Sequence, residues 1–235
     1  METILSVSEG FDENLLKIAA ATDEFESYAH PHAARIAVLA DALAQKFNLA
    51  SHDRFSLGQA ALVHDVGEMV MNREYIGANR LLRGGERVDM QRHTVIGEQE
   101  TAKRGLSRAV QLLVRWHHEW WNGSGYPDAL EHEQTPLAAR ILRVCDTFAA
   151  LTDSRPYSTA ISAAEAKRYL IEWAGIEFDP KVVKAFLTLE GLKELQSYAD
   201  KSENQTPDLI KEEPKEDSKN NVEKNVFSQF WDEPK

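Results

Sequence analysis

Cysteine, basic residues and long apolar segments are all scarce in this chain, and each shortage argues against a class of protein. Cys145 is the only cysteine among 235 residues, so an intramolecular disulfide is excluded and a reducing compartment, the cytoplasm, is expected. Lys and Arg number 27 against 38 Asp and Glu, and the net charge of −11 argues against a DNA- or RNA-binding surface. No apolar run can span a bilayer, and the start METILSVSEGFDEN lacks the features of a secretory signal, so no membrane insertion is expected.

Alternating strand patterns are also missing, whereas apolar residues at helical spacing recur along the chain, so we expect an all-α protein. Ile36, Leu39 and Leu43 form one such stripe, and Phe55 and Leu57 are expected to face inward in the next helix. Gly67 is expected to stop that helix, and residues 72–89 are expected to be irregular. Helices are expected at 14–21, from Pro31, over 53–64, from Met90, from Ser107, from Pro136, from Ser162, from Pro180 and over 192–199.

Composition divides the chain into three parts. Residues 1–21 are expected to form a helical lead-in, followed by a polar link at 22–30 that opens one domain over 22–199. Residues 200–235 are rich in Lys, Glu, Asn and Pro, so a disordered acidic tail is expected there. The tail ends in the aromatic sequence VFSQFWDEP, which is either a segment without contacts or a docking motif for a protein partner.

Metal-binding side chains lie on or beside the apolar stripes of five predicted helices. A single inward histidine is usually an ordinary core residue, but so many buried imidazoles and carboxylates are costly unless they are paired or bound to metal. The set contains only nitrogen and oxygen ligands, which suits iron, manganese, zinc or nickel, and it fits two ions better than one. Its members are His32, His64, Asp65, His93, His117, His118 and Asp146.

The segment WHHEWWNGSGYP, at 116–127, joins two of these histidines directly to a glycine-rich loop. Glycines end a helix and allow backbone to come close to a ligand, so the loop suits a substrate. If Asp65 bridges two ions, a hydroxide generated near neutral pH can attack a phosphorus atom in line.

These motifs resemble the HD-GYP subfamily of the HD phosphohydrolase superfamily, over roughly residues 20–189. The HHE sequence followed by NGSGYP carries most of the specificity, because a lone His-Asp dipeptide is common. The matching pieces are HAAR at 32–35, HDVG at 64–67, QRHTVIG at 91–97, HHEWWNGSGYP, PLAARILRVCDTFAAL at 136–151, RPY at 155–157 and GIEFDP at 175–180.

The resemblance implies an all-α bundle with a five-helix HD core and additional C-terminal helices. It implies hydrolysis of cyclic di-GMP to pGpG or GMP in bacterial signalling, at a centre of two divalent ions, iron or manganese before zinc or nickel. His64 and Asp65 would be the catalytic pair. One ion would be held by His32, His64, Asp65 and Asp146, and the other by Asp65, His93, His117 and His118. Some relatives carry a glutamate for a third ion where this chain has Tyr28.

The resemblance also implies a substrate side, made of the loop residues Gly123, Gly125, Tyr126 and Pro127 together with Arg155, which would meet a phosphate. Glu119 would stand behind the metal ligands or, alternatively, lie in solvent at a helix end. Trp120 and Trp121 would pack between helices or stack on guanine.

Two substitutions depart from the family pattern. Glu68 stands near the metals where HDxGK has a lysine, and Ser158 follows RPY where a basic residue is usual. Both remove positive charge from the side where phosphates would lie. The alternatives to a cyclic di-GMP phosphodiesterase are a non-catalytic HD-GYP signalling module and a general HD hydrolase of nucleotides, although the latter class does not need a GYP loop.

Overall fold

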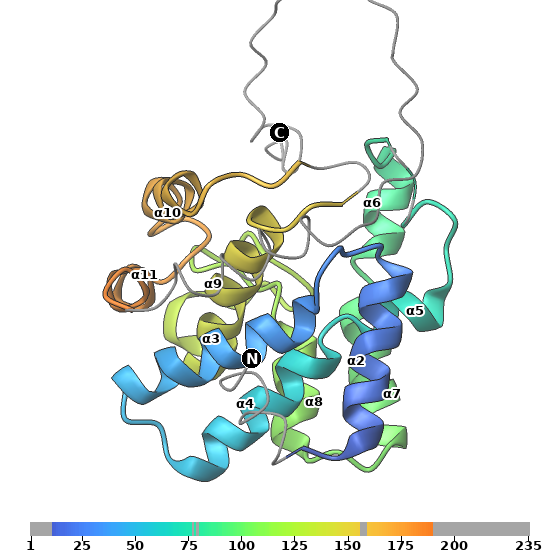
Figure 1. Cartoon of the computed structure of the whole chain (residues 1–235), viewed down its shortest axis with the longest axis horizontal. Coiled ribbons are helices and arrows are strands. Elements are labelled where there is room, and N and C mark those ends of the chain that lie inside the picture. Colours follow the sequence, from blue (N-terminus) through green and yellow to red (C-terminus); the bar gives the residue numbers. More distant parts are fainter. Residues whose placement is uncertain (1–10, 77, 79, 156–158, 190–235) are drawn as a thin grey trace, which may run out of the picture.

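The computed structural model describes residues 11–76, 78, 80–155 and 159–189, and within them the chain is helical, without a β-strand (Figure 1). This confirms the predicted all-α class. The predicted helix at 192–199, the tail at 200–235 and Ser158 lie outside the described residues. The helices are α2 (Glu13–Phe25), α3 (His32–Lys46), α4 (Ser51–Val63), α5 (Val66–Met71), α6 (Gly84–Met90), α7 (His93–Lys103), α8 (Arg108–Trp116), α9 (Leu137–Leu151), α10 (Ala163–Glu172) and α11 (Pro180–Phe186), with a short 3₁₀ turn at His132–Gln134.

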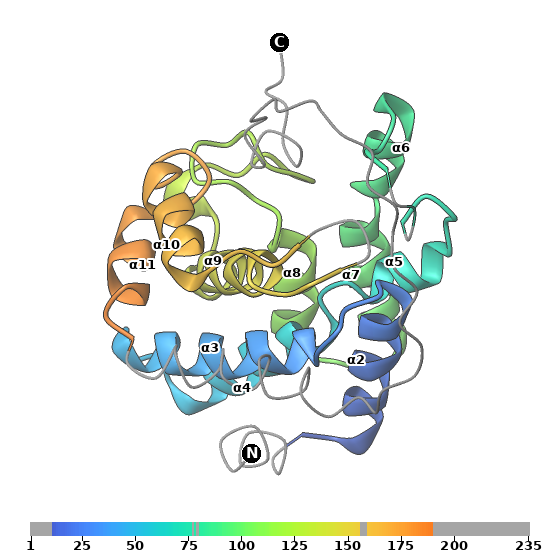
Figure 2. The same ribbon diagram turned by 45° about the horizontal axis from the view of Figure 1, so that its top comes forward.

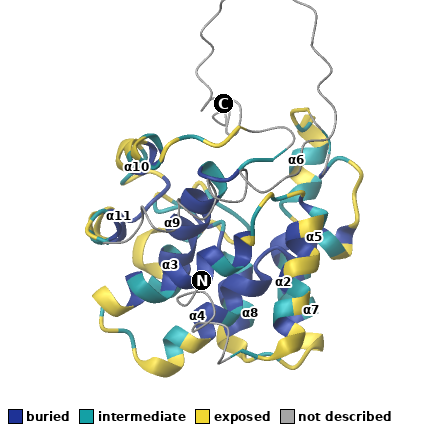
Figure 3. Cartoon of the chain, viewed as in Figure 1, coloured by how far each residue is buried: buried dark blue, intermediate teal, exposed yellow. Residues whose placement is uncertain are grey.

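The core lies where α3, α4, α8 and α9 pack against one another, and α10 and α11 cover α9 on one side (Figures 1 and 2). The predicted stripe of Ile36, Leu39 and Leu43 is buried there, as are Ile141 and Phe148 of α9. Figure 3 shows this burial at the centre of the bundle, with exposed residues at the loops and on the outer helix faces. Among the described residues, no helix combines the length and the apolar character needed to cross a membrane.

The prediction for Phe55 was wrong. Its side chain is 46% exposed and stacks on Phe11, with ring centroids 5.4 Å apart, whereas Leu57 is buried. Residues two apart on a helix point about 200° from each other, so Phe55 and Leu57 cannot share one face.

The helix α2 extends beyond its predicted end at residue 21 to Phe25. Its last turn contains Thr22 and Asp23, whose polarity resembles a link, yet both are buried. An Asp23 carboxylate oxygen accepts the backbone N–H of Ala33 at 3.2 Å, at the start of α3, so this acid fastens α2 to α3. Burial raises the pKa of Asp23 to about 6.

A third difference concerns α6, which lies within the segment that was predicted to be irregular. Gly84 and Gly85 resemble a turn, but they open a helix without buried residues. The Glu86 carboxylate accepts the backbone N–H of Arg83 at 2.8 Å and pairs with Arg80 at 2.7 Å, so local charges and capping hold the turn.

The helical conformation is interrupted between α4 and α5, at His64 and Asp65, where Asp65 has a non-helical ψ of 15°. Gly67 was predicted to stop the earlier helix, but it lies inside α5 and has a different role. A Cβ atom at Gly67 would lie 2.0 Å from the backbone oxygen of His93 and 2.9 Å from the backbone nitrogen of Gly97. The missing side chain therefore allows α5 to touch the first turn of α7, which brings Asp65 next to His93.

We predict that Gly67→Ala lowers the free energy of unfolding by about 1–3 kcal/mol, because the added methyl group meets backbone that cannot turn aside. The measurement is urea unfolding followed by circular dichroism. Gly85→Ala is the matched control, since a Cβ there has nothing within 4 Å, and it should be neutral or slightly stabilising. Equal effects of the two substitutions would contradict this explanation.

Candidate metal centre

All seven predicted metal-binding residues converge on one buried place in the bundle. One group consists of Asp65, His93, His117 and His118, and within it the possible ligand atoms lie within 4.8 Å of one another. The other group meets the same limit and consists of His32, His64 and Asp146. The residues come from the start of α3, the α4–α5 break, the start of α7, the end of α8 and the middle of α9.

Three of the imidazoles are oriented by the same kind of contact, between Nδ1 and a backbone carbonyl. The Nδ1 atoms of His64, His93 and His117 lie 3.0, 2.7 and 2.7 Å from the carbonyl oxygen three residues earlier in the chain. A carbonyl only accepts hydrogen bonds, so Nδ1 carries the proton in the neutral ring and Nε2 presents a lone pair. Each Nε2 is thereby prepared to bind a cation.

The other two imidazoles are held differently. His32 stacks on Tyr28 with ring centroids 3.7 Å apart, and the Arg155 guanidinium lies 4.6 Å from the centre of the same tyrosine ring. Tyr28 thus places an aromatic ring, and not a carboxylate, beside His32. The Nδ1 atom of His118 lies 2.8 Å from Nη1 of Arg143.

Asp65 joins the two groups. Its Oδ2 lies 3.1 Å from Nε2 of His64, and its Oδ1 lies 3.3 Å from Nε2 of both His93 and His117. Ligand atoms about 2.0–2.2 Å from one ion are themselves separated by roughly 3 Å, so these spacings suit cation binding. One carboxylate oxygen faces each group, as a bridging ligand requires.

The hydrogen bonds of the buried ligand atoms indicate whether a metal ion fits between them. His32 Nε2, His64 Nε2 and Asp65 Oδ1 are buried and have no hydrogen-bond partner within the described part of the chain. His32 Nε2 lies 3.5 Å from Asp146 Oδ1, which is long for a hydrogen bond. Buried polar atoms without partners are costly, and divalent cations would satisfy all three. The residues present therefore fit a divalent metal centre.

The charges in the metal-free protein support the same fit. Burial opposes the protonation of His64, but Asp65 and Asp146 outweigh it and raise its pKa to about 10. Burial also opposes the ionisation of Asp146, yet His32, His64 and Arg143 lower its pKa to about 2. Burial lowers the pKa of His32 to about 4, despite the nearby Asp146. A proton on His64 thus balances the carboxylates at neutral pH, in the place where a cation would do so.

The glycine-rich loop packs directly on His118. The Tyr126 ring stacks on the His118 ring at a centroid distance of 4.9 Å, and the Tyr126 N–H donates to the His118 carbonyl at 3.1 Å. A Cβ atom at Gly125 would lie 2.2 Å from the backbone nitrogen of Trp120, so only glycine permits this close approach. Gly123 has a positive φ of 80°, and Pro127 follows Tyr126 through a cis peptide bond.

Glu119 is buried and does not extend into solvent. Its carboxylate accepts the backbone N–H groups of Asp128 at 2.6 Å and Leu130 at 3.0 Å, so it fastens the far end of the loop. Glu68 is also buried, in the first turn of α5, three residues after Asp65. The tryptophans pack between elements: Trp120 meets Trp173 edge to face at 6.0 Å, and the Trp121 ring lies 5.6 Å from the Arg140 guanidinium.

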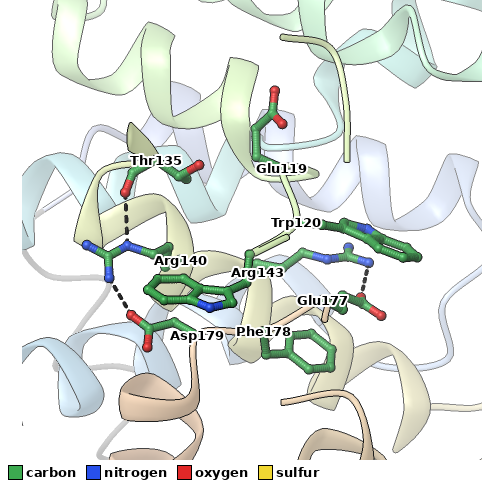
Figure 4. A pocket seen from close by; sticks show the side chains of 9 residues that line it. Glu119, Trp120, Thr135, Arg140, Arg143, Glu177, Phe178 and Asp179 are labelled. Carbon is green, nitrogen blue, oxygen red and sulfur yellow. Dashed lines mark hydrogen bonds and ion pairs between the residues drawn. The ribbon is translucent and has the colours of Figure 1, made fainter. Parts of the chain in front are cut away.

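Sequence reasoning missed Arg143 and Glu177. Arg143 lies on α9 one turn before Asp146 and is only 3% exposed, and it forms an ion pair with the buried Glu177 (Figure 4). Both residues belong to motifs that were recognised, in PLAARILRVCDTFAAL and GIEFDP, but they received no role. A charged residue within the apolar stripe of α9 was the signal that could have identified Arg143.

Comparisons with known proteins identify the family to which this chain is similar. The family model of the HD domain matches residues 17–182. A cyclic di-GMP phosphodiesterase of Pseudomonas aeruginosa is 34% identical over 168 residues, which cover 71% of this chain and 40% of that protein. The 3'3'-cGAMP-specific phosphodiesterase 2 of Vibrio cholerae is 27% identical over 186 residues, covering 78% of this chain and 36% of that protein. The chain thus spans less than half of the length of either relative.

Among solved structures, the cyclic GMP-AMP-specific phosphodiesterase V-cGAP3 of Vibrio cholerae has the same fold, with a TM-score of 0.62 and 20% identity. The match covers 83% of this chain and 53% of that structure. Together with the match to the family model and the HHE–NGSGYP sequence, these likenesses establish that the chain belongs to the HD domain family, in its HD-GYP branch.

Proposed function

We propose that the chain is a metal-dependent phosphodiesterase that hydrolyses cyclic di-GMP, or a related cyclic dinucleotide, to pGpG or GMP. The observation that carries the proposal is Asp65, whose two carboxylate oxygens face two separate groups of buried ligands. The names of the relatives, which specify cyclic di-GMP and 3'3'-cGAMP, support this substrate class.

The centre would hold two divalent ions, with iron or manganese as the first choice. His32, His64 and Asp146 would hold one ion, His93, His117 and His118 the other, and Asp65 would contact both. Bound ions would lower the pKa of water to near neutrality and stabilise negative charge on the phosphoryl oxygens. Tyr28 supports a limit of two ions, because its ring stacks on His32 at 3.7 Å where a third ligand would otherwise approach.

The substrate would lie on the side of the glycine-rich loop. Tyr126 fixes the loop against His118 by stacking, and Gly123, Gly125 and Pro127 shape its backbone. Arg155, whose guanidinium lies over the Tyr28 ring, would meet a phosphate group. The domain would extend over 22–199 in the cytoplasm, where a chain with one cysteine is suited to reducing conditions. The tail at 200–235 would either lack contacts or dock on a protein partner.

Glu68 favours a second candidate function, a signalling module without turnover. Burial raises the pKa of the Glu68 carboxyl to about 8, and the neighbouring Asp65 adds to this effect. A second buried acid, Glu26, lies nearby, and burial, Asp65 and Glu68 all raise its pKa well above the ordinary value. Divalent ions at the centre would favour the ionised form of this carboxyl. An anionic phosphodiester approaching this edge of the metal-loaded centre would then meet negative charge where the HDxGK pattern has a lysine.

We predict that protein purified without oxygen and loaded with Mn(II) or Fe(II) converts cyclic di-GMP to pGpG or GMP, as separated by chromatography. Asp65→Ala should lower turnover by about a hundredfold or more, because it removes the ligand that both groups share. His52→Ala is the matched control, since His52 is exposed and its loss should leave turnover unchanged. Absence of product from protein that holds two ions would favour the signalling module.

We also predict that Glu68→Lys lowers the KM for cyclic di-GMP about tenfold, because it exchanges a negative for a positive charge near the phosphates. Glu68→Gln should have an intermediate effect. The measurement is a steady-state titration of the metal-loaded proteins at one ionic strength. Unchanged KM and kcat in both variants would show that the carboxylate does not face the substrate.

The metal-free protein offers a test that is independent of turnover. Because the pKa of Glu68 is about 8 in the folded state and 4.5 ordinarily, the folded state binds the proton more tightly than the unfolded state. Stability is therefore lost as the pH rises from about 4.5 to about 8. We predict that Glu68→Gln becomes increasingly more stable than the wild type across this window in urea unfolding with a chelator present. A constant difference would contradict the buried position of the carboxyl.

A further inference from the structure

His118 differs from the other histidines of the group by the atom that its Nδ1 contacts. In His93 and His117 that atom is a carbonyl oxygen, which accepts a proton. In His118 it is Nη1 of Arg143, at 2.8 Å. A guanidinium has donors only, so Nδ1 of His118 must supply the lone pair.

Arg143 is firmly held in this position. Its Nη2 donates to the Glu177 carboxylate, its Nη1 lies 3.4 Å from Asp146 Oδ2, and the Glu177 carboxylate also accepts from the Tyr169 hydroxyl at 3.3 Å. Burial disfavours the guanidinium charge, but Glu177 and Asp146 raise the pKa of Arg143 above its ordinary value. A permanent positive charge therefore lies between His118, which belongs to one group of ligands, and Asp146, which belongs to the other.

Glu177 is itself anchored by the loop that follows His118. The backbone carbonyls of Glu177 and Ile176 accept the N–H groups of Trp121 and Asn122, each at 3.0 Å. The segment at 174–179, the loop and α9 thus form one connected unit around the guanidinium. Figure 4 shows the pair of Arg143 and Glu177 within it.

A metal ion cannot bind His118 while this hydrogen bond persists. If the ion binds Nδ1, it takes the lone pair that Arg143 uses. If the ion binds Nε2, the neutral ring carries its proton on Nδ1, and two donors then face each other at hydrogen-bond distance. Arg143 must leave His118 in either case.

We infer that Arg143 and a metal ion compete for His118, so that Arg143 weakens the binding of the ion in the His93–His117 group. With Arg143 in place, that group offers Asp65, His93 and His117, and His118 stays neutral with its proton on Nε2. This inference rests on the proposed two-ion centre. Arg143 acts on the centre through His118 and is a positioning residue.

The test is a titration of the metal-free protein with Mn(II), with the free ion counted by electron paramagnetic resonance. The wild type should bind one ion tightly and a second more weakly. Arg143→Met should tighten the weaker site about tenfold or more, because it removes both the competing hydrogen bond and a positive charge.

Arg140→Met is the matched control. Arg140 lies one turn earlier on α9 and pairs with Asp179 of the same segment, as Arg143 does with Glu177 (Figure 4). The Arg140 guanidinium lies 5.6 Å from the centre of the Trp121 ring and donates to the Thr135 carbonyl at 2.9 Å. The Arg140→Met variant should leave the affinities of both Mn(II) sites unchanged. An equal gain in Arg140→Met would overturn the inference.

Competition for His118 is separated from a general effect of charge by a double-mutant cycle. In a His118→Ala background, most of the gain from Arg143→Met should disappear. A gain of the same size in that background would overturn the inference, because it would come from charge alone.

Arg143→Met leaves Glu177 buried without its cation, so Arg143→Met/Glu177→Gln is titrated alongside it, with circular dichroism as the measure of folding. The double variant should show the same tightening. Two equally tight sites in the wild type, with no change in the variants, would overturn the competition and leave the proposed function intact. Absence of Mn(II) binding in the wild type would overturn both.

Discussion

The buried carboxylate of Asp65 imposes the condition on which the rest of the structure depends. It is 8% exposed and is surrounded by imidazole nitrogens at 3.1–3.3 Å, in a place that water does not neutralise. Ionised groups remain in such a place only if opposite charge accompanies them. In the metal-free protein a proton on His64 supplies that charge, and in the proposed enzyme two divalent ions would supply it. The break between α4 and α5 and the close contact of Gly67 with α7 serve to bring these groups together.

The helical class and the convergence of the metal-binding residues could be predicted from the sequence. Their prediction succeeded because apolar periodicity shows which face of a helix turns inward, and His32, His93 and Asp146 lie on those faces. Contacts between distant segments could not be predicted in this way. Gly67 resembled a helix stop, because no pattern along the chain shows that another backbone lies against it. Phe55 is a different case, because its position two residues from Leu57, about 200° around the helix, already excluded a shared inward face. The helix α6 was missed because its stability comes from local charges and not from an apolar face.

Arg143 and Glu177 illustrate the same limit within the candidate site. Each belongs to a recognised motif, yet their relation appears only when α9 packs against the segment at 174–179. The sequence emphasised the loss of positive charge at Glu68, near one edge of the centre. The structure adds a buried positive charge at Arg143, beside His118. Arg143 contacts Nδ1 of His118 at 2.8 Å in one group and lies 3.4 Å from Asp146 in the other, so the two ions of the proposed centre would not be equivalent.

The central claim is that Asp65 joins two groups of ligands into one centre. The most direct measurement is the low-temperature electron paramagnetic resonance spectrum of the wild-type protein loaded with two Mn(II) ions per chain. If a carboxylate bridges the two ions, their electron spins are coupled, and the spectrum should be that of a coupled pair. A spectrum that is the sum of two independent Mn(II) signals would contradict the account, because it would place the ions in separate sites.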